Sequence, residues 1–219
     1  MFMRFVCASS MCLCVVSAAA QSPFVEDFEG GLAGWGAGGG LDPAVLGTEG
    51  GNSFASVTAP VTAAVPGAPF NSFTALAGNL DNGASGGAFA GNYPASGITG
   101  LSFDVRHNAG QDLTFTLRVA TPANNPGFIV FNPTVVAAGS EFTTLSYSFD
   151  LSNPLIFPLL DPAAVLPNVG NIQLLVDRPV VGEVGEVMFD FDNVAIVPAP
   201  ATGALLGGLG LTGLRRRRS

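Results

Sequence analysis

Glycine and proline recur along the whole chain and limit what it can fold into. The sequence contains 29 Gly and 16 Pro, so 45 of its 219 residues interrupt regular structure, whereas the usual share is about 12%. Because both residues weaken helix interiors, this density excludes long helices, coiled coils and helical repeats. Phe, Leu, Ile and Val are interspersed with the breakers and provide a core, which argues against disorder. The candidates that remain are turn-rich, all-β folds.

Short segments of alternating polarity predict the strands. The clearest is 112–120, in which apolar residues from Leu113 to Val119 alternate with Thr and Arg, the period of a half-buried strand. Segment 101–106 alternates in the same way, and 107–111 is expected to join the two as a hairpin loop with His107 on the surface. Further strands are expected at 24–29, 53–58, 73–76, 128–131, 145–149, 172–176 and 187–197.

These segments predict a single domain over residues 21–197. About nine short strands separated by Gly and Pro are typical of an antiparallel β-sandwich, here a jelly roll. The Pro-rich stretch 154–167 is expected to form a long loop with one helical turn near Asp161 to Val165.

The charges divide the chain into an acidic body and basic ends. All 16 acidic residues fall between Glu26 and Asp192, where only three Arg accompany them, which gives that span a formal charge of −13. Binding to nucleic acid requires cations that replace the counterions of the phosphates, so this function class is excluded. Divalent cations and neutral surfaces are more compatible with such a body.

The N-terminus has the organisation of an export signal. A short segment with Arg4 precedes the apolar stretch 5–16, and small residues then lead to a cleavage site between Ala20 and Gln21. The alternative is a short buried helix. All three Cys lie within residues 1–20, so cleavage leaves no disulfide and no catalytic thiol.

The C-terminus has three parts: the motif Val197-Pro198-Ala199-Pro200, the uncharged stretch 201–214, and Arg215, Arg216, Arg217 and Arg218. As a helix, fourteen residues cover about 21 Å, less than the ~30 Å of a bilayer core. This layout resembles the PEP-CTERM sorting signal, with Ala199 in place of the usual Glu. The resemblance implies sorting by an exosortase-like protease after export, transient inner-membrane contact of a hydrophobic helix at 201–214, and delivery to the cell surface or extracellular matrix. An ordinary tail anchor is the alternative.

The two ends of the body carry a second resemblance. Asp27-Phe28-Glu29 followed by Gly34-Trp35, together with Phe189-Asp190-Phe191-Asp192-Asn193-Val194 near the end, is similar to the jelly-roll sandwiches of carbohydrate-binding modules. The resemblance implies that the first and last strands lie side by side and that Glu29 and Asp192 are ligands of a structural Ca²⁺. Trp35 is then the best candidate for stacking on a sugar, or alternatively a Trp that closes one end of the sandwich.

The alternation near the C-terminal end independently raises the question of a cation. Asp190 and Asp192 share one face with Val194 and Ile196, so either a bulge near Asn193 changes the face or a carboxylate enters the core. A buried carboxylate needs a partner, and Ca²⁺ with oxygen ligands is one. The alternative is a solvated strand end. A catalytic metal is disfavoured because His107 is the only His.

No motif predicts catalysis. Gly83 to Gly87 matches G-x-S-x-G, but no apolar strand precedes it and no helical pattern follows it. The sequence therefore predicts an exported, non-enzymatic surface or matrix protein, and the alternative is a carbohydrate-binding module that contacts extracellular polysaccharide.

Overall fold

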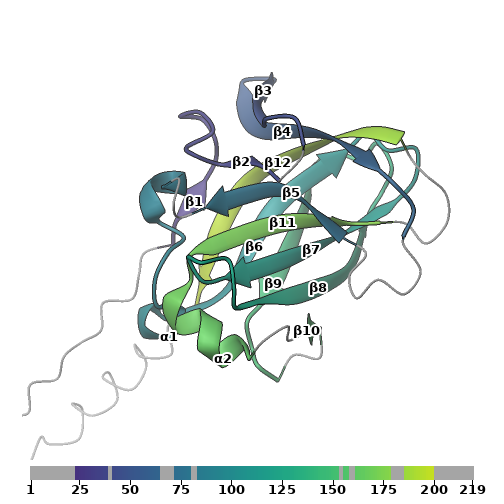
Figure 1. Ribbon diagram of the computed structural model, residues 1–219. Helices are drawn as coiled ribbons and strands as arrows, with labels where there is room; N and C mark the ends of the chain where they lie inside the picture. The colour runs from purple at the N-terminus through teal and green to yellow at the C-terminus, as the bar shows by residue number, and fades with distance from the viewer. Residues whose placement is uncertain are drawn as a thin grey trace, which may run out of the picture.

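The computed structural model describes residues 23–38, 41–64, 72–79, 83–152, 155–157, 161–178 and 185–199. In this part of the chain, two antiparallel sheets pack against each other (Figure 1). Sheet A contains, in order, β3 (Val45–Glu49), β4 (Asn52–Val61), β12 (Gly185–Pro198), β6 (Ile98–His107) and β9 (Thr143–Ser148), with β1 (Val25–Glu26) beside β12. Sheet B contains, in order, β10 (Ile156–Phe157), β8 (Gly127–Val136), β7 (Leu113–Ala120), β11 (Asn171–Asp177), β5 (Ser72–Asn79) and β2 (Gly36–Ala37).

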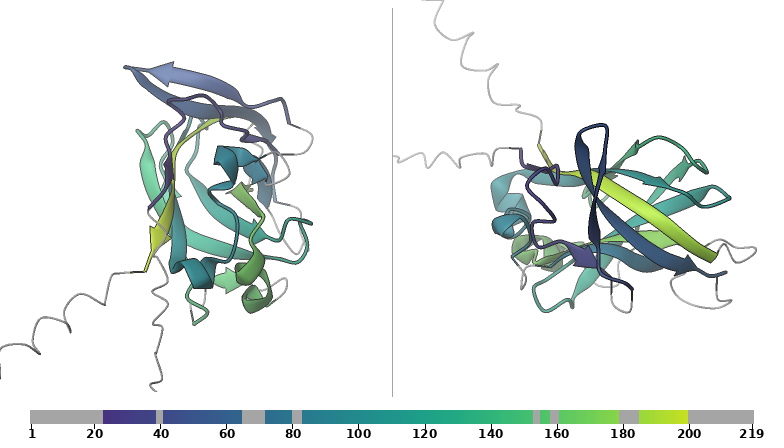
Figure 2. Two further views of the ribbon diagram at one scale, coloured as in Figure 1. Left: turned by 90° about the vertical axis from the view of Figure 1, so that its left-hand side faces the viewer. Right: turned by 90° about the horizontal axis from the view of Figure 1, so that it is seen from above.

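The sandwich confirms the all-β, jelly-roll prediction. Figure 2 shows the two layers facing each other. Phe, Leu, Ile and Val side chains form the core between them. Helical structure is limited to α1 (Tyr93–Ser96), α2 (Pro162–Val165) and the 3-10 turns η2 (Ala84–Gly87) and η3 (Leu166–Asn168) in the residues described. The helical turn expected near Asp161 is α2, and the side chain of Asp161 caps it by accepting a hydrogen bond from the backbone N–H of Ala163 at 2.9 Å.

The predicted hairpin between 101–106 and 112–120 is wrong. β6 pairs with β12 and β9 in sheet A, whereas β7 pairs with β8 and β11 in sheet B. The segment between them therefore crosses from one sheet to the other. Alternation shows which face of a strand is buried but not which strand is its neighbour, so the sequence pattern did not distinguish a hairpin from a crossover.

His107, expected on the surface, is the last residue of β6 and is only 4% exposed. Its Nδ1 accepts a hydrogen bond from the backbone N–H of Ala109 at 3.2 Å, and its Nε2 lies 3.1 Å from the carbonyl oxygen of Val136. The accepting Nδ1 places the proton on Nε2, which donates to that carbonyl. Both ring nitrogens thus have partners, and the neutral ring is compatible with burial.

A bulge in β12 explains the parity of its last residues. Phe189 and Phe191 point into the core, while Asp190 and Asp192 lie on the outer face of sheet A. The pairing with β6 shifts register between Asp192 and Ala195, and Asn193 has a φ of +48°. After the shift Val194 is again in the core. Of the two alternatives from the sequence, the bulge is therefore correct.

The first and last strands are neighbours, as the resemblance implied: Val25 pairs with Ala195 and Glu26 with Val194. β12 extends to Pro198, and the backbone N–H of Ala199 donates to the carbonyl of Gly97 at 2.6 Å. The first three residues of the predicted sorting motif are thus attached to the sandwich, which extends two residues beyond the expected boundary at Val197.

Several predicted features lie outside the described residues: the signal peptide with its cleavage site between Ala20 and Gln21, Pro200 of the sorting motif, the stretch 201–214, and Arg215 to Arg218. Among the helices that are described, none is long and apolar enough to cross a membrane.

Candidate functional site

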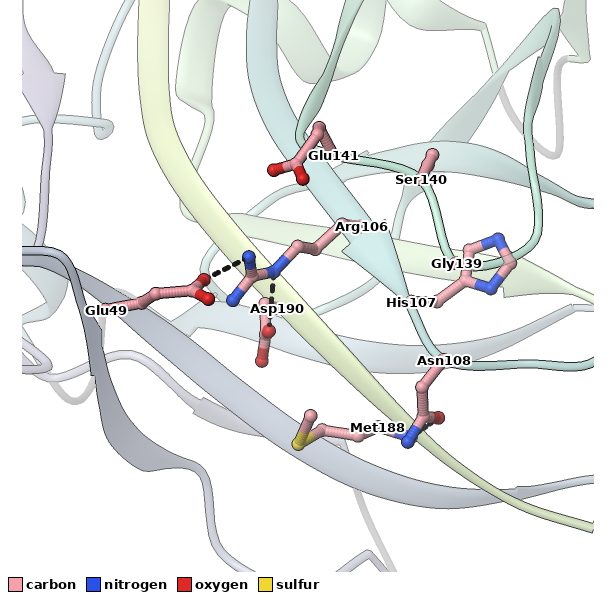
Figure 3. A pocket seen from close by; sticks show the side chains of 9 residues that line it. All are labelled: Glu49, Arg106, His107, Asn108, Gly139, Ser140, Glu141, Met188 and Asp190. Atoms are coloured by element: carbon pink, nitrogen blue, oxygen red, sulfur yellow. Dashed lines mark hydrogen bonds and ion pairs between the residues drawn. The ribbon is translucent and has the colours of Figure 1, made fainter.

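A pocket of about 240 Å³ opens where β6 ends and β12 begins, next to the loop between β8 and β9 (Figure 3). Three strands of sheet A and this loop supply its walls. We call it the Arg106 pocket, and its principal side chains are Glu49, Arg106, Ser140, Glu141, Met188 and Asp190. Its volume is below the roughly 300–1,000 Å³ of sites for drug-sized ligands, so the pocket suits a group about as large as one ring.

The guanidinium of Arg106 organises the pocket. Its Nε donates to Oδ2 of Asp190 at 2.9 Å, and its Nη1 forms an ion pair with Glu49 on the edge strand β3. Burial acts to lower the pKa of Arg106, but the hydrogen bonds and charges of Glu49 and Asp190 outweigh it and raise the pKa. Figure 3 shows both carboxylates directed at this one guanidinium.

Two aromatic rings fix Arg106 in place. Its Cζ lies 4.9 Å from the ring centre of Phe54 and 4.6 Å from that of Phe142, distances typical of cation–π contacts. Gly47 allows this arrangement, because a Cβ there would lie 2.1 Å from the Phe54 ring. A planar cation is thus packed against two rings on the outer side of sheet A, and these rings also contact each other with centres 5.7 Å apart.

Two buried polar atoms on the wall of the pocket have no hydrogen-bond partner among the described residues: Oδ1 of Asp190 and Oγ of Ser140. Asp190 is only 3% exposed. Buried polar atoms in native proteins are nearly always paired, so such an atom at a pocket indicates a group that another molecule satisfies. Met188 is 41% exposed beside them, and its flexible side chain can move aside for a ligand.

Glu141 adds a further free acceptor. It is exposed in the loop before β9, and its carboxylate makes no hydrogen bond or ion pair with any residue that the structure describes. The pocket therefore combines unengaged acceptors with a hydroxyl and a fixed cation.

Of the predicted calcium ligands, Asp192 lies further along this face of sheet A and Glu29 lies in the loop after β1. Glu29 accepts from the backbone N–H of Ser53 at 2.8 Å and from its hydroxyl at 3.3 Å. Asp192 accepts from Nδ2 of Asn52 at 2.9 Å and from the backbone N–H of Asn193 at 2.7 Å. The structure thus brings the two carboxylates to adjacent residues of β4.

Burial raises the pKa of Asp192; hydrogen bonds from Asn52 and Asn193 oppose this rise, and the charges of Asp104 and Asp27 add to it. Nevertheless, no group of three or more His, Cys, Asp or Glu side chains in the described ranges is placed to hold a metal ion. As they stand, Glu29 and Asp192 do not form a calcium site by themselves, and bound calcium remains a prediction.

Trp35 belongs to the core. It is 3% exposed and packs edge-to-face against Phe28 and Phe89, with ring centres 6.3 and 5.4 Å away. Its Nε1 donates to Oγ of Ser85 at 2.8 Å, and that hydroxyl donates to Glu26 at 2.6 Å. The expectation of a sugar-stacking surface at Trp35 is therefore not met, and the alternative of a Trp within one end of the sandwich describes it. The same bonds give Ser85 of the G-x-S-x-G match a structural role.

The outer face of sheet B offers polar groups that mostly satisfy one another. Arg118 donates from Nη1 to Asn124 Oδ1 at 2.6 Å and to Gln173 Oε1 at 2.7 Å. Asp177 accepts from the hydroxyls of Thr114 and Thr116 at 3.1 and 2.7 Å. Because these groups already have partners, this face has less unmet hydrogen-bonding capacity than the Arg106 pocket.

Sequence reasoning singled out Asp190 for its face but missed Arg106, Glu49 and Glu141. One signal was present: Arg106 is one of three cations in a body with 16 acidic residues, and a lone cation on an alternating strand indicates ion pairing. Its partners come from three other segments of the chain, which only the sheet order brings together.

No known family matches the sequence, and no curated protein matches it. Several solved structures resemble this chain. An exo-β-agarase is 15% identical over 80% of this chain and 24% of that chain, with a TM-score of 0.50. CBM27-1 of Caldicellulosiruptor saccharolyticus, solved with mannohexaose, is 16% identical over 83% of this chain and all of that chain, with a TM-score of 0.48.

The family 11 carbohydrate-binding module of Clostridium thermocellum, solved with a β-1,3-1,4-mixed-linked tetrasaccharide, is 14% identical over 81% of this chain and 96% of that chain, with a TM-score of 0.46. At 15% identity, the likeness to the exo-β-agarase concerns the fold alone.

Proposed function

We propose that this chain is an exported, non-catalytic domain that binds an extracellular polysaccharide, and that the Arg106 pocket receives one sugar unit. The observation that carries the proposal is the presence of two buried, unpartnered polar atoms, Asp190 Oδ1 and Ser140 Oγ, on one ring-sized pocket. A sugar hydroxyl both donates and accepts, so separate hydroxyls of one ring suit a carboxylate acceptor and a serine hydroxyl on the same pocket. The fixed Arg106 supplies donors for a further sugar oxygen.

Binding without turnover fits the chemistry of the pocket. Hydrolysis of a glycosidic bond needs one carboxylic acid as proton donor and a second carboxylate across the bond. Glu49 and Asp190 are instead both bonded to the same guanidinium. Glu141 is then the one carboxylate of the described pocket that is not bonded to Arg106, and His107, a further titratable group there, uses both ring nitrogens within the fold.

Export and sorting are supported by sequence features: the export signal at 1–20 and the PEP-CTERM-like signal at 198–219, read by the export machinery and an exosortase-like protease. A polysaccharide-binding body between the two signals would act at the cell surface or in the extracellular matrix.

Native gels that contain neutral, acidic or amino polysaccharides test the proposed function. At least one polysaccharide is expected to retard the protein, and Asp190→Asn is expected to weaken retardation by about tenfold or more, as for the loss of a charged hydrogen bond. Asp161→Asn is the matched control, because it removes an equal charge at α2 and keeps the capping oxygen. No retardation by any polysaccharide, or release of sugar by the protein, would contradict the proposal.

A further inference from the structure

The outer side of sheet A carries an excess of negative charge around the Arg106 pocket. Six carboxylates, which we call the acidic face, lie on the outer side of its strands or beside the pocket: Glu49, Asp104, Glu141, Glu186, Asp190 and Asp192. Asp192 and Asp104 are direct cross-strand partners, a placement in which like charges repel. The amide of Asn193 donates to Asp104 at 2.8 Å beside this pair. Of the three body Arg, Arg118 lies on β7 and Arg178 follows β11 in sheet B, which leaves Arg106 as the cation described on this face.

The pocket itself has a net negative charge. Glu49, Asp190 and Glu141 contribute three negative charges, and Arg106 contributes one positive charge. His107 contributes none, because the N–H of Ala109 donates to its Nδ1 and requires that nitrogen to be unprotonated. A ligand that carries positive charge therefore completes the charge balance of the pocket.

We propose, on the basis of the proposed function, that the sugar unit in the Arg106 pocket carries a free amino group, as in a polymer of glucosamine. A protonated amine has three donors and no acceptor. The two unengaged acceptors of the pocket, Glu141 and Oδ1 of the 3% exposed Asp190, match those donors. Ser140 Oγ remains for a ring hydroxyl. An N-acetyl group removes the charge and two of the donors, so acetylated units bind more weakly.

The spacing of the carboxylates favours an organic cation over a metal ion, since no three of the described acidic or His side chains are placed to hold a metal. Along the rest of the acidic face, the negative charges of Asp104 and Asp192 attract further amino groups of the same polymer without direct contact. This repetition suits a polysaccharide whose successive units each carry a charge.

Calorimetry with two matched oligosaccharides tests the inference. Glucosamine hexamer and N-acetylglucosamine hexamer share one backbone and differ only in the acetyl groups. A mildly acidic buffer keeps the amine charged, and about 0.15 M salt screens non-specific electrostatic attraction. The glucosamine hexamer is expected to bind at least about tenfold more tightly. Asp190→Asn reduces this affinity about tenfold or more. Glu141→Gln, an exposed change that leaves the core intact, reduces it about twofold to fivefold. Asp161→Asn leaves it unchanged.

The outcomes separate this inference from the proposed function. Equal affinity for the two hexamers, or retention on neutral polysaccharides alone, would overturn the amino-sugar inference and leave polysaccharide binding in place. Absence of binding to every glycan would overturn both. Binding of hexalysine as tight as that of the glucosamine hexamer, or loss of glycan binding on addition of EDTA, would also overturn the inference, because the face would then bind any polycation or act through a metal.

Discussion

The backbone N–H of Ala109 donates to Nδ1 of His107 at 3.2 Å, which keeps the buried imidazole neutral at the end of β6. Burial lowers the pKa of His107, and the bond to the Val136 carbonyl and the charge of Asp112 only partly oppose this. The neutral ring therefore contributes its full stability above the unfolded pKa of about 6.5. That contribution is lost as the pH falls below this value, because the unfolded chain then binds a proton that the folded chain excludes.

Wild type is expected to have a higher free energy of unfolding than His107→Gln. We expect this difference to shrink as the pH falls from about 7.5 to about 5.5. Urea unfolding followed by circular dichroism at both pH values measures it. Asp177 and Asp192, whose pKa values burial raises, act in the opposite direction in both proteins and cancel in the comparison. An advantage that stays constant or grows at the lower pH would contradict the neutral, buried imidazole.

Substitution of Trp35 separates core packing from ligand binding. Trp35→Ala is expected to reduce the free energy of unfolding by about 3–5 kcal/mol, because it leaves a cavity between Phe28 and Phe89. Trp35→Phe loses less, since a ring remains while the bond to Ser85 is lost. Folded Trp35→Phe is expected to keep wild-type retention on polysaccharide gels. Lost retention with unchanged stability would instead make Trp35 a ligand-binding residue.

Gly78 is expected to be intolerant of a side chain because the Trp35 ring fills the space next to it. A Cβ at this position would lie 2.7 Å from the Trp35 ring. Gly78→Ala should therefore destabilise the fold by about 1–3 kcal/mol, as expected for overpacking. Gly110→Ala is the control, because a Cβ there meets no atom within 4 Å. Equal melting temperatures of the two variants would show that Trp35 does not fill this space.

The calcium prediction depends on Asp192. Without calcium, Asp192→Asn is expected to raise the melting temperature at neutral pH, because burial and the charges of Asp104 and Asp27 disfavour the ionised carboxyl. If calcium joins Glu29 and Asp192, added Ca²⁺ raises the melting temperature of wild type, EDTA reverses the gain, and Asp192→Asn shows neither effect. Identical melting of wild type with Ca²⁺ and with EDTA would refute the calcium prediction.

The sorting prediction requires a truncation that spares β12. Val197 pairs with Gly100 and Pro198 with Ile98, and the N–H of Ala199 bonds to Gly97. A chain that ends after Ala199 is expected to fold normally and to change its distribution among membrane, cell-surface and secreted fractions. A chain that ends after Val197 loses the last contacts of the strand as well and serves as the comparison. An unchanged distribution and an unprocessed C-terminus in the full chain would contradict sorting by this signal.

The sequence predicted the sandwich because alternation and turn residues are local signals. Segments such as 112–120 show their buried face directly, and the strand β7 covers nearly the same residues. β3 was missed because Val45 and Leu46 are both exposed on an edge strand and so break the alternation. β2 and β10 contain only two residues each and carry no period.

The candidate site was predictable only in part. The shared face of Asp190 and Asp192 follows from strand period, and the bulge at Asn193 was one of two stated alternatives. The contact of Arg106 with Glu49 depends on the placement of β3, β4, β12 and β6 side by side, which links residues 57 positions apart. The burial of Trp35 likewise follows from a bond to Ser85, 50 residues away.

Chemical-shift mapping of the ¹⁵N-labelled protein with glucosamine hexamer tests the central claim most directly. The account predicts that the largest changes occur at the Arg106 pocket, in the backbone amides of Ser140 and Glu141 and in the Nε–H of Arg106. Arg118 and Gln173 on the outer face of sheet B should remain unchanged. Changes centred on Arg118 and Gln173, or no changes at saturating oligosaccharide, would contradict it.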